Sequence, residues 1–136
     1  MKSDETRVYL LVTDFGEDAA VVTRMVGLEP THIKVPGQAD AQFPKTISHI
    51  HCWELHSPLP ATSHINAHID ALLQLLEPHA VEFKAVAEVF KAGINCVVYY
   101  YEDFTPGIHL SEHAIKLLAT MNLSIDFDLY FLGEEE

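Results

Sequence analysis

The fold of this chain is decided by residues 94–132, which read INCVVYYYEDFTPGIHLSEHAIKLLATMNLSIDFDLYFL. The apolar, β-branched and aromatic residues at 94–101 predict a strand. Thr105, Pro106 and Gly107 are typical of a tight turn. Ser111 is a typical N-cap before a helix, and the apolar-polar alternation over residues 124–132 predicts a second strand. This end of the chain therefore predicts a strand–helix–strand unit, and it contains no reaction motif.

The residues before position 94 predict six further helices and strands. They are strand 7–13, helix 17–26 ended by Gly27, a short edge strand 31–35, strand 46–56, a helix capped by Thr62 or Ser63 and reaching Leu76, and, after Pro78, a helical segment 79–91 ended by Gly93. This order predicts a single α+β domain over residues 1–136. We expect a mixed four- to five-stranded sheet with helices mainly on one face, built as a ferredoxin-like core plus an extra α-β unit.

The chain is acidic. It has 136 residues, of which 49% are hydrophobic and 21% charged, and its formal net charge is -12. Residues 69–136 hold twelve acids and three bases, whereas residues 1–68 hold eight acids and five bases. This charge disfavours binding to nucleic acid or to anionic membranes, which both need clustered Lys and Arg. It is compatible with a basic partner, with metal cations, or simply with solubility.

The cellular location is predicted from the N-terminus and the cysteines. Residues 1–6 lack the apolar region of a secretory signal, and no apolar run approaches the roughly 20 residues of a membrane span. Cys52 and Cys96 lie in apolar stretches and do not form a Cys-x-x-Cys motif. We therefore expect a soluble, cytoplasmic protein with two free cysteines, and no motif indicates a cofactor.

Nine histidines raise the alternative of a metal site. His49 and His51 would share one face of the predicted strand 46–56, next to Trp53 and Leu55. Two pairs, His64 with His68 and His109 with His113, have the four-residue spacing at which a helix can grip one ion. No glutamate follows His64, so the metalloprotease motif is absent. We expect scattered histidines, with a metal-dependent hydrolase using the histidine-rich strand as the alternative.

The polar face of the last two strands is the predicted binding surface. Asp126, Asp128 and Tyr130 point to one side of strand 124–132, because side chains alternate along a strand. Tyr99 and Tyr101 belong to the neighbouring strand. Tyrosines beside carboxylates on an uncovered sheet face are suited to recognising a basic protein, and the same face could form a homodimer. The alternatives without a binding function are that the tyrosines pack within their own sheet and that the carboxylates are only solvated.

Trp53 is the sixth predicted binding residue. It is the only tryptophan, and two placements fit the sequence. It could anchor a groove beside the proline-rich loop, or it could fill the core.

The motifs together resemble a known family. They are VGLEPT at 26–31, Gly37, WEL at 53–55, LEP at 76–78, TPGI at 105–108 and IDFDLY at 125–130. In order and spacing, over nearly the whole chain, they resemble a family of small bacterial proteins described only as domain of unknown function 4279. Where such proteins often place a basic residue beside the loop glycine, this chain has Pro36-Gly37-Gln38. The resemblance implies no established activity and no catalytic residues.

These observations favour a non-enzymatic binding module with an acidic surface. By analogy of charge alone, it would dock a basic partner as small immunity proteins dock toxins. Gly-rich phosphate loops and Gly-x-Ser-x-Gly motifs are absent from the sequence. Besides the metal-dependent hydrolase, a dimeric small-molecule sensor of the ferredoxin-like kind is the other alternative.

Overall fold

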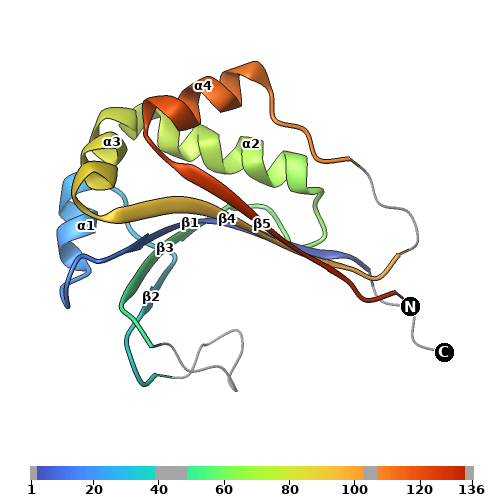
Figure 1. Ribbon diagram of the computed structural model, residues 1–136, viewed down its shortest axis with the longest axis horizontal. Helices are drawn as coiled ribbons and strands as arrows, with labels where there is room; N and C mark the ends of the chain where they lie inside the picture. The colour runs from blue at the N-terminus through green and yellow to red at the C-terminus, as the bar shows by residue number, and fades with distance from the viewer. Residues whose placement is uncertain (1–2, 39–48, 103–106, 134–136) are drawn as a thin grey trace.

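A computed structural model describes residues 3–38, 49–102 and 107–133. They form one mixed sheet and four α-helices (Figure 1). The strands are β1 (Glu5–Thr13), β2 (His32–Lys34), β3 (Cys52–His56), β4 (Lys91–Tyr100) and β5 (Ser124–Phe131). The helices are α1 (Ala20–Val26), α2 (Ile65–Leu76), the 3-10 turn η1 (Glu77–His79), α3 (Ala80–Val89) and α4 (Glu112–Thr120). No helix in these ranges is long and apolar enough to span a bilayer.

The sheet confirms the predicted architecture. Its strand order is β2-β3-β1-β4-β5. All pairs among β1, β2, β3 and β4 are antiparallel, which is the ferredoxin-like arrangement. Strand β5 then adds to β4 in parallel through α4. This last β-α-β crossover is the extra α-β unit that residues 94–132 predict, and it places β5 at one free edge of the sheet.

The helices lie on one side of the sheet. Figure 1 shows α2, α3 and α4 above the strands, and α1 packs beside α3. The core forms between this layer and the strand side chains that point toward it, including Val8, Leu10, Ile94 and Val98. The opposite side, which we call the helix-free face, carries the alternate side chains of each strand, such as Tyr9, Asn95 and Asp126. A binding surface on the sheet must lie on this face or on an edge.

The start of α4 agrees with the sequence prediction, whereas the starts of α1 and α2 differ from it. The ring of His64, and not Thr62 or Ser63, caps α2, because its Nδ1 accepts a hydrogen bond of 3.0 Å from the backbone N–H of Asn66. Ser111 caps α4 as predicted, with Oγ accepting from Ala114 N at 3.0 Å. Helix α1 begins only at Ala20, because Asp18 lies before it and accepts from Ala20 N.

The predicted end of the helix before β4 and the predicted start of β3 are also wrong. The helix expected to reach residue 91 ends at Val89, and Gly93 lies inside β4 instead of ending the helix. Gly93 is opposite Leu11 and Ser124, and an added Cβ there would collide with the Ser124 hydroxyl, so close strand packing explains the glycine. Strand β3 begins at Cys52, later than the predicted residue 46, and residues 46–48 and 105–106 lie outside the described ranges.

Candidate functional site

The acidic residues of the predicted binding surface lie where the alternation places them. Asp126 and Asp128 are exposed on the helix-free face of β5, opposite Asn95 and Val97 of β4. Tyr130 is exposed on the same face, opposite Tyr99. The structure thus brings four of the six predicted residues together as one patch, which we call the acidic patch (Tyr99, Asp126, Asp128 and Tyr130).

The two tyrosines of the acidic patch stack on each other. The rings of Tyr99 and Tyr130 stack with centroids 5.2 Å apart and an angle of 15° between their planes. Tyr101 lies past the end of β4, half-buried, and its backbone N–H donates to Asp4 Oδ1 at 2.7 Å. Stacked rings lose little further rotamer freedom on binding, so the Tyr99–Tyr130 pair is a pre-ordered contact surface.

Trp53 does not lie on this surface. Its side chain is 0% exposed, and it belongs to the core between the sheet and Phe83 of α3. The indole Nε1 donates a 3.0 Å hydrogen bond to Thr23 Oγ1. The structure therefore corrects the prediction that Trp53 is a binding residue, because strand β3 turns this side chain toward the helices.

The free edge of β5 adds apolar side chains that the sequence did not single out as a contact surface. Phe127 and Phe131 point to the helix side, yet Phe131 is 65% exposed. Leu132, just past the strand, is also exposed. The partly buried Ile125 and Leu129 of the same strand pack against the core. The edge strand therefore presents apolar side chains on one side and carboxylates on the other.

A second polar cluster occupies the other half of the helix-free face. Glu54 of β3 is only 3% exposed, and its carboxylate lies 3.1 Å from Lys34 Nζ of β2 and 2.8 Å from His56 Nε2. The ring of Tyr9 stacks on His56 with centroids 4.6 Å apart. These contacts fix β2 and β3 against β1.

The electrostatics of this cluster keep Glu54 ionised. Burial alone would raise the pKa of Glu54, but the hydrogen bond from His56 and the charge of Lys34 outweigh it, so the pKa is lowered. Burial raises the pKa of Tyr9, so its hydroxyl stays protonated. An ionised, paired Glu54 is suited to holding the strands together and not to donating a proton.

The histidines are spread over separate surroundings. His49 and His51 precede β3, so they share no strand face with Trp53, contrary to the prediction. His64 caps α2, His68 is buried, and His113 contacts Glu77 at 3.0 Å on the surface. Nowhere in the described ranges do three His, Cys, Asp or Glu side chains group so that they could hold a metal ion. The histidine-rich strand thus supplies no ligand set for a metal-dependent hydrolase within those ranges.

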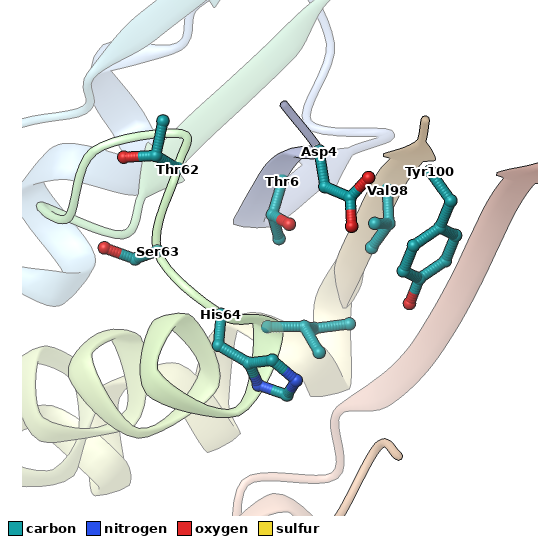
Figure 2. Close-up of a pocket in the computed structure, with 8 residues that line it drawn as sticks. Asp4, Thr6, Thr62, Ser63, His64, Val98 and Tyr100 are labelled. Atoms are coloured by element: carbon teal, nitrogen blue, oxygen red, sulfur yellow. The ribbon is translucent and has the colours of Figure 1, made fainter. Parts of the chain in front are cut away.

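A pocket of about 120 Å³ lies where β1 and β4 meet the start of α2 (Figure 2). Asp4 and Tyr100 line one side of it and His64 the other. Asp4 Oδ1 accepts the backbone N–H groups of Tyr101 and Glu102, and His64 caps α2. These polar groups hold the ends of β1, β4 and α2 together, and we assign the pocket no catalytic role.

Comparison with known proteins places the chain in a family. Searches of curated proteins and of solved structures return no match. A model for a domain of unknown function, DUF4279, matches residues 4–132, from just before β1 to just after β5. The match thus covers the ferredoxin-like core, the extra α-β unit and the acidic patch. The chain belongs to the DUF4279 family.

Proposed function

We propose that this protein is a non-enzymatic binding module that docks a basic segment of a partner protein along β5. The observation that carries the proposal is the position of β5 at a free edge of the sheet, with Asp126 and Asp128 exposed on one side and Phe127 and Phe131 on the other. The acidic patch and this edge are continuous, so one extended segment would contact both.

The backbone of β5 supplies the affinity. Only one side of β5 pairs with β4, so the alternate N–H and C=O groups along its eight residues point away from the sheet. Such an edge is a template for a further strand, and natural proteins bind extended peptides in this way. The exposed Phe127 and Phe131 would give apolar side chains of the added strand a surface to cover.

The charge of β5 selects the partner. Two copies of β5 paired antiparallel about Phe127 would set Asp126 of one copy opposite Asp128 of the other, and like charges directly opposite destabilise a sheet. A partner strand with Lys or Arg opposite Asp126 and Asp128 would instead pair with both of these carboxylates. Charge complementarity therefore favours a basic partner over a second copy of this chain.

A toxin-neutralising role is the specific form of this proposal. Small acidic proteins that block basic toxins rely on the same complementarity of charge, which gives fast and selective association. The support is analogy of charge together with the exposed acidic edge. The broader proposal, a docking edge for a basic segment, does not depend on it.

The test uses an eight-residue peptide in which lysine alternates with valine, matched to the length of β5. Calorimetry at low ionic strength would compare the wild type with the double variant Asp126→Asn/Asp128→Asn. Two exposed charge pairs contribute about 1 kcal/mol together, so we expect the variant to bind roughly five- to tenfold more weakly.

The matched control is Glu82→Gln/Glu88→Gln on α3, which removes the same charge from two exposed positions on the helix layer. It should change the affinity by less than about twofold. Equal weakening by both double variants would show that the peptide responds only to net charge, and would overturn the proposal.

A further inference from the structure

The aromatic residues at the end of β5 form two stacked pairs with residues of β4. Tyr99 and Tyr130 stack on the helix-free face, with ring centroids 5.2 Å apart. The next residue of each strand repeats the contact on the helix side, where Tyr100 and Phe131 stack with centroids 4.9 Å apart. Both pairs are direct partners in the parallel register of the two strands. The ring separations are close to the spacing of neighbouring strands, about 4.8 Å, so each pair is one step of an aromatic ladder across the sheet.

Each aromatic ladder ends on β5 with an exposed ring. The rings on β4 are covered, because Tyr99 is half-buried and Tyr100 is only 4% exposed. The rings on the edge strand are open, because Tyr130 is 47% exposed and Phe131 is 65% exposed. One face of each edge ring stacks on β4, and the other face points to the position that an added strand would occupy.

The backbone contacts at this end of the sheet hold both aromatic ladders in place. Past the end of β5, the N–H of Leu132 donates to the carbonyl of Tyr100 at 2.8 Å. Past the end of β4, the N–H of Tyr101 donates to Asp4 Oδ1 at 2.7 Å. These bonds tie the ends of β1, β4 and β5 together, so a ligand that stacks on the edge rings would meet a pre-ordered surface.

The surroundings of Tyr130 favour a planar cation. The side chain next to it on an added strand would have its Cβ about 4.5–5.5 Å away, and a planar group there would extend the stack. Asp128 is exposed on the same face of β5, two residues before Tyr130, which is a diagonal position that a long side chain can reach. Arginine meets both requirements, because its guanidinium stacks on aromatic rings and donates to a carboxylate, whereas lysine has no plane to stack.

We propose that the position beside Tyr130 is an arginine subsite, where the guanidinium of a docked strand stacks on the open face of this ring and donates to the Asp128 carboxylate. The subsite rests on the proposed docking along β5, and it names one residue of the partner. Because side chains alternate along a strand, the neighbour of this arginine would lie beside Phe131 on the helix side. An apolar residue there would cover the exposed phenyl ring, so the docked segment would carry an arginine next to an apolar residue.

The experiment compares two eight-residue peptides by calorimetry at low ionic strength. Valine alternates with lysine in one peptide and with arginine in the other, so charge and strand propensity are matched. We expect the arginine peptide to bind the wild type about three- to tenfold more tightly than the lysine peptide. In Tyr130→Leu this preference should fall below about twofold, because the ring on which the guanidinium stacks is gone.

The matched control is Phe131→Leu, which removes an exposed ring from the same strand end but from the helix side. It should keep the preference for arginine. Equal binding of the two peptides by the wild type, persistence of the preference in Tyr130→Leu, or its equal loss in both variants would overturn the arginine subsite and leave docking along β5 in place. Absence of binding by both peptides would overturn the docking proposal and the subsite with it.

Discussion

Replacing Glu54 by glutamine is the sharpest test of the charge cluster that holds β2 and β3. The substitution keeps the shape of the side chain but removes the charge that Lys34 and His56 contact at 3.1 Å and 2.8 Å. Because Glu54 is 3% exposed, its own side chain gains little hydration in place of the lost interactions.

The magnitude follows from the burial of the two partners. Breaking a fully buried ion pair costs about 3–5 kcal/mol. The side chain of Lys34 is 26% exposed and regains some hydration, which reduces this penalty. We therefore expect Glu54→Gln to lower the free energy of unfolding by about 2 kcal/mol at pH 7.

The pH dependence gives the result that would refute this reasoning. The folded pKa of Glu54 is lowered, so its contribution is present above the unfolded value of 4.5 and is lost as pH falls through the folded pKa. Urea unfolding followed by circular dichroism at pH 7, 5.5 and 4 would measure it, with the exposed Glu29→Gln as the control. Equal stability of wild type and Glu54→Gln at pH 7, or a gap that widens on acidification, would refute the account.

Three further predictions follow from the buried contacts. Trp53→Phe should lower the free energy of unfolding by about 2 kcal/mol in urea titrations, because it opens a cavity and removes the bond to Thr23; an unchanged value would contradict the burial. Ser111→Ala should cost about 1 kcal/mol in the same assay by removing the cap of α4, and a loss near zero would speak against that cap. Because burial lowers the pKa of His68, the wild type should lose stability as pH falls below 6.5, and His68→Gln should lose less between pH 7.5 and 5.5; equal losses in melting temperature would argue against a neutral buried ring.

Local signals in the sequence were sufficient for most of the architecture. The apolar and polar alternation in residues 124–132 predicts β5, and the aromatic run before it predicts β4. Ser111 and Gly27 mark helix ends by their own backbone and side-chain chemistry. These features depend on neighbours a few residues away, which a single sequence displays directly.

The errors arise where distant residues decide the outcome. Gly93 is a helix terminator by local rules, but it lies inside β4, where it pairs with Leu11 of β1 and Ser124 of β5. The cap of α2 is an exception, because the ring of His64 bonds to Asn66 only two residues away. Trp53 fits a groove or a core equally well until the twist of β3 and the position of Phe83 are known.

In the candidate sites, too, some features follow from local sequence and others depend on how distant strands pair. The alternation alone places Asp126 and Asp128 on one face of β5. The exposure of Phe127 and Phe131 depends on β5 being an edge strand, which follows from the strand order and not from the residues themselves. Likewise, Lys34 reaches Glu54 only because β2 pairs with β3 in one particular register.

Amide hydrogen exchange of β5 with and without the alternating Lys-Val peptide tests the docking proposal most directly. We expect the outward-pointing N–H groups between Ser124 and Phe131 to become protected, because a new strand would hydrogen-bond them. A peptide with proline in place of valine keeps the charge but lacks the N–H group at each proline. Because proline also fixes φ, this peptide cannot pair as a regular strand along β5, and it should protect far less. Unchanged exchange in β5 on peptide binding, or equal protection by both peptides, would contradict the claim that β5 is a docking edge.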